Sequence, residues 1–283
     1  MSPLVADELA QWAQYIQSAT GIYLDGSKGY LIETRFAPLL KEVGTTSFGE
    51  LLRRTQVDTT GALRRKVVDA ITTNETSFFR DNSPFELLQH KLIPDLIDTR
   101  NRSTGAVRPI PIRIWSAACS TGQEVYSIAM LFHELKVDLK RFDVRIFGTD
   151  ISDRALAAAS RGTFAKMEID RGLPLDRLGR YFATDGQTYR VKDEIRAMAT
   201  FRSINLLEPF TFPHKFDLVL CRNVAIYFTE RDKARLFGSI ARVMAPDGTL
   251  LIGSTETITG ICPQFEPKRH VRSVFYSLKV NGS

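Results

Sequence analysis

From residue 112 onward, short apolar runs alternate with stretches of helical spacing, and this alternation limits the possible folds more than any other feature. The strand-like runs and the helical stretches between them are, in chain order, 112–115, 122–135, 144–149, 154–160 and 216–221. Such alternation is typical of βαβ units, in which a helix connects two parallel strands. We therefore expect an α/β domain with a mainly parallel sheet over residues 112–283.

The first 90 residues show no strand-like alternation and carry helical signals instead. Apolar residues recur at helical spacing over 5–16, with Ser2 as the expected N-cap and Gly21 as the stop. Similar patterns follow at 31–43 and 63–71. The sequence therefore predicts an N-terminal all-helical domain that ends near residue 90.

The segment after Ile97 is the best candidate for a linker. A helix that begins at Ser83 is expected to end near Ile97, and the residues that follow combine arginine, glycine and proline. We assign residues 91–111 to the linker. The segment has an arginine cluster without acidic residues, which indicates either a solvated linker or a docking surface for an acidic partner. The cluster consists of Arg100, Arg102, Arg108 and Arg113.

Residues 161–200 interrupt the alternation of strands and helices. The aromatic pair Tyr181 and Phe182 precedes a turn at 184–186, and polar and apolar residues then alternate over 188–192. This pattern predicts an antiparallel hairpin between helices. We therefore expect a small antiparallel β-subdomain inserted into the α/β domain.

The composition is that of an ordinary globular protein, with 43% hydrophobic and 25% charged residues. No run approaches the roughly 18 apolar residues of a membrane-spanning helix, and the N-terminus lacks a secretory signal. We expect no membrane insertion and a cytoplasmic location. The three cysteines and four histidines lie far apart, without CxxC or HExxH spacing, so no metal site is expected. The net charge of +6 leaves a nucleic-acid partner open.

Polar residues follow the predicted strands at the edge where open α/β sheets bind ligands. Asp150 ends the second strand, where a carboxylate can accept hydrogen bonds from ribose hydroxyls; alternatively, Asp150 or Ser152 caps the next helix. The loop 116–124 consists of small residues but lacks GxGxxG, so a ligand without a pyrophosphate fits better. Its alternative role is helix capping through Ser120 or Thr121.

Two further strand ends and one junction carry polar groups. Asn205 and Leu206 follow a strand expected to end near residue 204, and the sequence CRNVAIYF begins at Cys221, where the strand 216–221 ends. Tyr227 in this sequence is either a pocket residue or a core aromatic with a satisfied hydroxyl. The segment 73–81, TNETSFFRD, is polar around a phenylalanine pair and is expected either to line a cleft between the domains or to form an ordinary interdomain turn.

Five segments in order, NETSFFRD, SAACSTGQEVYSIAM, GTDIS, INLL and CRNVAIYF, resemble the chemotaxis receptor glutamate methyltransferases of the CheR family. The resemblance covers essentially the whole chain. It implies a Rossmann-like sheet that binds S-adenosylmethionine (SAM) and an enzyme that methylates glutamates on the cytoplasmic helices of chemoreceptors. The products are glutamyl γ-methyl esters and S-adenosylhomocysteine (SAH).

The resemblance also implies roles for individual residues. It places Arg80 and Tyr227 next to the transferred methyl group, Glu124 at the amino group of the cofactor and Asp150 at its ribose. The implied cofactor contacts are Asn74, Thr76, Arg80, Glu124, Asp150, Asn205, Leu206, Arg222 and Asn223.

Three departures from the family pattern bear on these roles. The usual STGEE loop reads STGQE, so Gln123 stands in place of the first glutamate and Glu124 is kept. The second helix keeps the basic residues Lys28, Arg35 and Lys41 that the family uses against the receptor, but it also has acidic residues. The hairpin loop at 183–187 is shorter than in members that bind a pentapeptide at the receptor C-terminus, so we expect no such tether.

The expected chemistry agrees with the residue types present. A glutamate with a pKa of about 4.3 is already ionised at neutral pH, so its methylation needs no general base. A nucleic-acid methyltransferase is a weaker alternative, because CRN stands where a [DN]PP[YFW] motif belongs. A non-catalytic sensor would be expected to lose Arg80 and Tyr227, and a nicotinamide oxidoreductase would need GxGxxG.

Overall fold

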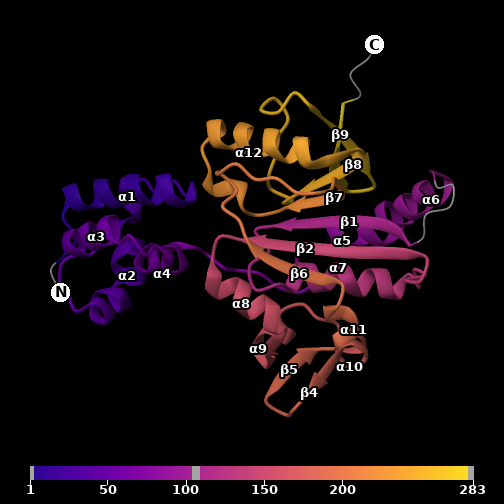
Figure 1. Ribbon diagram of the computed structural model, residues 1–283, viewed down its shortest axis with the longest axis horizontal. Helices are drawn as coiled ribbons and strands as arrows, with labels where there is room; N and C mark the ends of the chain where they lie inside the picture. Colours follow the sequence, from indigo (N-terminus) through magenta and orange to yellow (C-terminus); the bar gives the residue numbers. More distant parts are fainter. Residues whose placement is uncertain (1–2, 104–108, 280–283) are drawn as a thin grey trace.

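The computed structural model describes residues 3–103 and 109–279, and a seven-stranded sheet forms its centre (Figure 1). Four of its strand pairs are parallel. The other two pairs are antiparallel: the strand next to the edge runs antiparallel to its inner neighbour, and the edge strand runs antiparallel to that strand. In spatial order the strands are β6 (Ala199–Ser203), β2 (Phe142–Asp150), β1 (Ile110–Ala117), β7 (Phe216–Cys221), β8 (Met244–Ile252), β10 (Ser273–Leu278) and β9 (Phe265–His270). This arrangement confirms the expected Rossmann-like α/β sheet.

The order of the strands creates a switch point between β1 and β7. From β1 the chain builds outward through β2 to β6, then returns to the other side of β1 with β7 and β8. Ala117 pairs with Thr149 on one side and with Cys221 on the other, and Cys221 pairs with Ile252. Because these strands end in register, the loops that follow them share one edge of the sheet, where such folds bind ligands.

Both faces of the sheet are buried, which explains why β7 is a continuous apolar run. Leu218 and Leu220 face a core that includes α7, whereas Val219 and Cys221 face a core with α12. The helices of this domain are α5 (Ser83–Leu87), η2 (Leu88–Leu92), α6 (Ile93–Ser103), α7 (Gln123–Glu134), α8 (Asp153–Arg161), η3 (Ala225–Tyr227) and α12 (Glu230–Val243).

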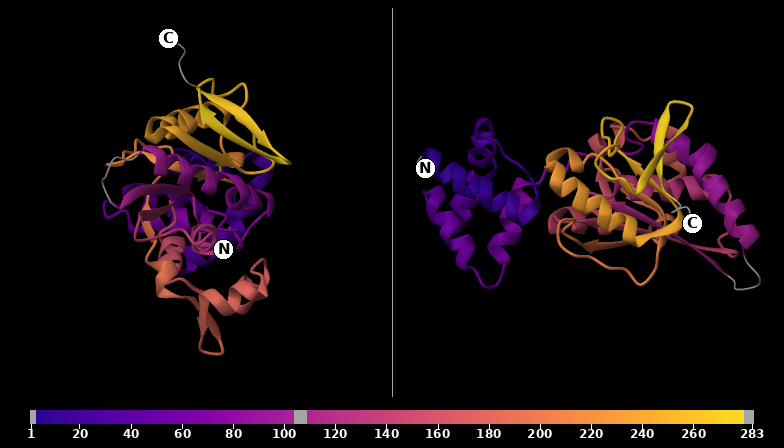
Figure 2. Two further views of the ribbon diagram at one scale, coloured as in Figure 1. Left: turned by 90° about the vertical axis from the view of Figure 1, so that its right-hand side faces the viewer. Right: turned by 90° about the horizontal axis from the view of Figure 1, so that it is seen from above.

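The N-terminal helices form a lobe beside the sheet with a core of their own (Figures 1 and 2). They are α1 (Ala6–Thr20), η1 (Gly26–Lys28), α2 (Gly29–Val43), α3 (Phe48–Val57) and α4 (Ala62–Ile71). Gly21 ends α1 in a left-handed conformation with φ 79°, as expected of a C-terminal glycine. Ser2 lies outside the described residues, and α1 begins at Ala6 because the Glu8 carboxylate accepts the Val5 amide.

The boundary between the two domains falls earlier in the chain than residue 90. The buried residues of the first core end at Ile71, whereas Phe78, Phe85 and Leu88 pack into the core of the sheet. The expected linker at 91–111 is also helical as far as Ser103. Arg100 holds this helix to the sheet by ion pairs with Asp217 and Asp247, which the local pattern did not reveal.

Those ion pairs also bear on the arginine cluster. Arg100 is paired, and Arg113 forms an ion pair of 2.8 Å with Asp143. Arg108 lies outside the described residues. Two of the four arginines are therefore engaged within the protein, which argues against an arginine docking surface.

The inserted subdomain contains three antiparallel strands and three short helices, and it projects from the edge of the molecule (Figures 1 and 2). The elements are β3 (Thr163–Ala165), α9 (Lys166–Asp170), α10 (Leu175–Tyr181), β4 (Phe182–Thr184), β5 (Thr188–Val191) and α11 (Asp193–Arg196). Phe164 and Phe182 pack against Phe78. The expected antiparallel subdomain is thus confirmed. It ends before residue 200, because β6, a strand of the main sheet, already begins at Ala199.

The C-terminal strands differ from expectation in two places. β8 begins at Met244. The residues 246–248, Pro-Asp-Gly, are typical of a turn before a strand that starts at 249, but they form an irregularity within β8, opposite Phe216 and Leu218. β9 was not predicted at all, since its residues FEPKRH combine proline with charged side chains at an exposed sheet edge. Across the described residues no helix is long and apolar enough to cross a membrane.

Candidate functional site

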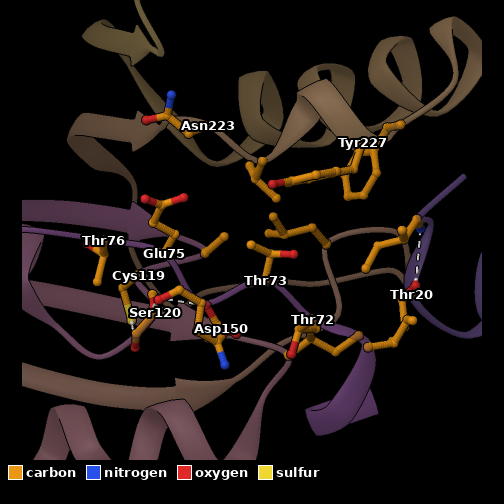
Figure 3. Close-up of a pocket in the computed structure, with 18 of the residues that line it drawn as sticks. Thr20, Thr72, Thr73, Glu75, Thr76, Cys119, Ser120, Asp150, Asn223 and Tyr227 are labelled. Atoms are coloured by element: carbon orange, nitrogen blue, oxygen red, sulfur yellow. Dashed lines mark hydrogen bonds between the residues drawn. The ribbon is translucent and has the colours of Figure 1, made fainter. Parts of the chain in front are cut away.

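A pocket lies where the sheet edge meets the N-terminal domain (Figure 3). Asp150, Ser120 and Cys119 lie on one side of it, and Asn223 and Tyr227 lie on the other. All ten residues implied by the resemblance line this pocket, namely Asn74, Thr76, Arg80, Glu124, Asp150, Asn205, Leu206, Arg222, Asn223 and Tyr227. The topology explains their meeting, because the loops after β1, β2, β6 and β7 share one edge.

Asp150 is a buried carboxylate held by backbone amides. Its Oδ2 accepts from the Ser120 amide at 2.8 Å, and its Oδ1 accepts from the Ser152 amide at 2.9 Å. Burial raises the Asp150 pKa, while these hydrogen bonds act in the opposite direction. Helix α8 is capped by Ser152, whose Oγ accepts from the Ala155 amide. Ser152 is therefore the cap of α8, whereas Asp150 binds the loop after β1 through the Ser120 amide and lines the pocket.

The backbone of the small-residue loop after β1 lies close to the pocket. Ala118 and Ser120 have left-handed φ values of 59° and 51°. Helix α7 begins after Gly122, without a capping hydrogen bond from a side chain. Ser120 instead donates to the carbonyl of Asn74 at 3.0 Å, which rules out the capping alternative for this serine. The loop thus binds the 73–81 segment and leaves room for a ligand.

Arg222 connects three parts of the site through a nearly inaccessible guanidinium. Its Nη1 donates to Glu124 Oε2 at 2.8 Å, and its Nη2 donates to Asp81 Oδ2 at 2.9 Å and to the Arg80 carbonyl at 2.8 Å. The side chain is 2% exposed and lies 5.5 Å from the Phe85 ring centre. Arg222 therefore binds Glu124 and the Arg80 turn together, a role that its position in the sequence did not predict.

The Arg80 turn has an unusual backbone. Phe79, Asp81 and Asn82 all adopt left-handed φ values, between 49° and 68°. Non-glycine residues keep such conformations only where their surroundings hold them. The Phe79 amide donates to Ser127 Oγ on α7, and Arg222 holds Asp81. The half-buried Arg80 side chain donates to the Glu75 carbonyl at 2.7 Å and lines the pocket.

Tyr227 and Asn223 come from the loop after β7. Tyr227 is half-buried; it packs against the core that includes α12 and also lines the pocket. Its carbonyl accepts from the Tyr23 amide of the N-terminal domain at 3.0 Å. Asn205, after β6, donates to the Ala19 carbonyl at 3.0 Å. The two domains are therefore joined at the pocket itself.

The N-terminal domain contributes lining residues that the sequence analysis did not place in the pocket, although it named Lys28 and Arg35 as part of a basic helix face. They include Tyr23, Lys28, Leu31 and Arg35. Arg35 reaches the end of α4 and the start of the polar segment, where it donates to the Ile71 carbonyl and to Thr73 Oγ1. Helical periodicity could not reveal these residues, because their pocket role depends on how the domains pack.

The cysteines near the site are buried and unreactive in character. Burial raises the pKa of the Cys119 thiol well above its usual range, and the charges of Asp150 and Glu124 raise it further. Burial has the same effect on Cys221. Within residues 3–103 and 109–279, no three His, Cys, Asp or Glu side chains form a group that could hold a metal ion.

Two family descriptions match the chain. "CheR methyltransferase, all-alpha domain" covers residues 7–72, and "CheR methyltransferase, SAM binding domain" covers residues 74–273. A solved TehB-like SAM-dependent methyltransferase from Corynebacterium glutamicum has 14% identity and a TM-score of 0.38, and covers 65% of this chain and 86% of that chain. That likeness is too weak to carry an argument, so the assignment depends on sequence.

Sequence relatives cover both domains. Chemotaxis protein methyltransferase Cher2 of Pseudomonas putida is 38% identical over 276 residues, which are 96% of this chain and 98% of that protein. Chemotaxis protein methyltransferase 1 of Vibrio cholerae is 38% identical over 278 residues, 96% of this chain and 97% of that protein. With family matches over 7–72 and 74–273, the chain belongs to the CheR methyltransferase family.

Proposed function

We propose that the protein transfers the methyl group of SAM to glutamate side chains on the cytoplasmic helices of chemoreceptors. The reaction yields glutamyl γ-methyl esters and SAH, and it serves chemotactic adaptation in the cytoplasm. One observation carries the proposal. A single pocket combines the carboxylates of Asp150 and Glu124 with the side chains of Arg80 and Tyr227.

The residues of the pocket fit SAM. The buried Asp150 carboxylate suits ribose hydroxyls, and Glu124 suits the cationic amino group. Ile151 and Leu206 offer apolar surface for the base, and the backbone at Ser120 leaves space for close approach. Bound SAM supplies an activated methyl group with its own leaving group. We assign the cofactor contacts to the nine residues named from the resemblance, with Arg222 acting through its bond to Glu124.

The protein's own part in the reaction is alignment. The substrate glutamate is ionised at neutral pH, so no side chain needs to take its proton. Arg80 provides a positive charge, and Tyr227 provides a hydroxyl that can donate to a carboxylate oxygen. Together they orient the incoming carboxylate, and the N-terminal domain closes one side of the pocket against water.

Transfer of labelled methyl groups tests the proposal. The protein is incubated with methyl-labelled SAM and membranes that contain chemoreceptors, and the labelled receptor is then treated with alkali. We expect label on the receptor that is released as methanol, because γ-methyl esters hydrolyse in alkali. No transfer to any receptor would contradict the proposal and favour a sensor. Alkali-stable label would indicate methylation of nitrogen instead.

Asp150→Asn is expected to weaken SAH binding about tenfold to a hundredfold, because a hydrogen bond to a charged group contributes roughly 1.5–3 kcal/mol. Titration calorimetry with SAH measures the affinity. Asp153→Asn is the matched control, since Asp153 is exposed, pairs with Arg65 and is absent from the pocket lining. Equal affinity of Asp150→Asn and the wild type would exclude the ribose role.

The pH dependence of binding follows from the same carboxylate. Burial raises the Asp150 pKa, so on acidification this group binds a proton at a higher pH than an ordinary aspartate does. The neutral form is a poorer acceptor for ribose hydroxyls. SAH affinity of the wild type should therefore fall as the pH drops through the raised pKa, and this part of the fall should be missing in Asp150→Asn.

We propose that the protein needs no tether to a receptor pentapeptide. The loop between β4 and β5 spans 185–187, and the Asp185 carboxylate holds it by accepting from the amides of Gln187 and Thr188. Calorimetry with a pentapeptide from a chemoreceptor C-terminus should give no measurable heat of binding. A micromolar dissociation constant would refute the prediction.

A further inference from the structure

Glu256 follows β8, and its carboxylate accepts hydrogen bonds from three backbone amides. Oε2 accepts from the amides of Asn223 and Gly253, both at 2.7 Å, and Oε1 accepts from the amide of Ile226 at 3.2 Å. Two of these amides belong to the loop that carries Tyr227. In the described structure Glu256 is not one of the residues lining the pocket. Its contacts therefore act on the loop, not on a ligand.

The loop after β7 depends on such support. Asn223 has a left-handed φ of 58°, which a non-glycine residue keeps only when its surroundings hold it. Helix η3, which contains Tyr227, has no capping hydrogen bond from a side chain in its own sequence. Glu256 binds the loop on both sides of Val224, through Asn223 and Ile226. A carboxylate is suited to this task because it only accepts hydrogen bonds and has two oxygens.

The Glu256 carboxylate lies close to the backbone of Gly253, where a side chain would not fit. A Cβ atom on Gly253 would lie 2.5 Å from Glu256 Oε2 and 3.0 Å from Asn223 Nδ2. The Glu256 amide also donates to the Gly253 carbonyl at 2.9 Å, which closes the turn after β8. A side chain at residue 253 would push the carboxylate and the loop apart, so the two residues form one unit.

We infer that Glu256 is a positioning residue for methyl transfer, which holds Asn223 and Tyr227 at the pocket through the backbone of their loop. On the other side of the loop, the Tyr227 carbonyl accepts from the Tyr23 amide at 3.0 Å. The loop is thus fixed from the sheet and from the N-terminal domain. This inference rests on the proposed function, since its effect is read in the rate of that reaction.

Glu256→Gln tests the inference with little change in volume. The amide keeps one acceptor oxygen and turns an NH2 group toward at least one of the three backbone amides, so the loop shifts. We expect kcat to fall about tenfold. The SAH dissociation constant should rise by less than about threefold, because Asn223 is one of nine assigned cofactor contacts and Asp150 and Glu124 lie on other loops. A rate within twofold of the wild type would overturn the inference. Equal losses in kcat, SAH affinity and thermal stability would do so too, because they indicate general unfolding.

Two further experiments test whether a lower rate in Glu256→Gln comes from misfolding. One is a different substitution that displaces the same carboxylate, and the other is a double variant. Gly253→Ala displaces the same carboxylate and should lower kcat in the same way. In a Tyr227→Phe background, Glu256→Gln should lower kcat by less than about threefold, because much of its effect on the rate acts through the Tyr227 hydroxyl that this background already lacks. Full additivity would contradict the inference. Glu266→Gln, on the edge strand β9, is the control and should keep the wild-type kcat.

The outcomes separate the inference from the proposed function. If the wild-type protein transfers no methyl group to receptor membranes, the proposed function fails and Glu256 has no reaction to support. If the wild type transfers methyl and Glu256→Gln matches it, the function stands and the inference fails. The SAH titration needs no receptor, so it can be measured whichever result the transfer assay gives.

Discussion

Arg80→Ala is expected to lower methyl transfer by about 10²-fold, because the incoming carboxylate loses the cation that aligns it with the methyl group. Arg80 lines the pocket, and its turn is held in a strained conformation by Arg222 and Ser127. The protein keeps this strain to present one cationic side chain, which points to a role in the reaction. The measurement is the initial rate of label transfer from SAM to receptor membranes at saturating SAM.

The affinity for SAH separates chemistry from cofactor binding in the Arg80 variant. We expect it to fall by less than the rate, because Asp150 and Glu124 remain. Arg80→Lys keeps the charge and should recover part of the rate. Arg171→Ala is the matched control, since Arg171 pairs with the neighbouring Glu75 at 3.0 Å but does not line the pocket. An unchanged rate in Arg80→Ala would refute the role.

Arg222→Met is expected to lower the free energy of unfolding by about 3–5 kcal/mol, the range found when one partner of a buried ion pair is removed. The change leaves the carboxylates of Glu124 and Asp81 without their cation, and it releases the Arg80 carbonyl. Urea denaturation followed by circular dichroism measures the effect.

A surface ion pair provides the contrast for Arg222. Arg145 is half exposed and pairs with Asp143 at 2.8 Å, so Arg145→Met should change stability by less than about 1 kcal/mol. Arg222→Lys keeps a charge but cannot bind three acceptors in a planar fork, so an intermediate loss is expected. Equal stability of Arg222→Met and the wild type would show that the network is not needed for folding.

The centre of the sheet was largely predictable because strands such as β7 are buried on both faces. Strands such as 216–221 are continuous apolar runs that alternate with amphipathic helices, and this pattern is local. The polar residues that end them were predictable for the same reason, since parallel strands direct their loops to one edge. β9 and the first half of β8 were missed, because an exposed edge and an irregular register leave no apolar pattern.

The boundary of the first domain could not be predicted from periodicity. Helices α5 and α6 have the same spacing as the helices of the N-terminal domain, and only packing assigns Phe85 and Leu88 to the sheet. The resemblance identified the lining residues, yet the partners that hold them are remote in sequence. Asp81 and Arg222 are 141 residues apart, and Asn223 and Glu256 are 33 apart. Neither pair leaves a signal in a single sequence.

Residues of both domains line the pocket, so exchanging one domain between relatives would change it. Tyr23, Lys28 and Arg35 belong to the N-terminal domain but line the same pocket as Asp150, and Gly21 lies against Leu207 and Phe228 without room for a side chain. A chimera that takes its first 72 residues from another member would therefore have a changed pocket wall beside Asp150. The two domains must consequently evolve as a matched pair.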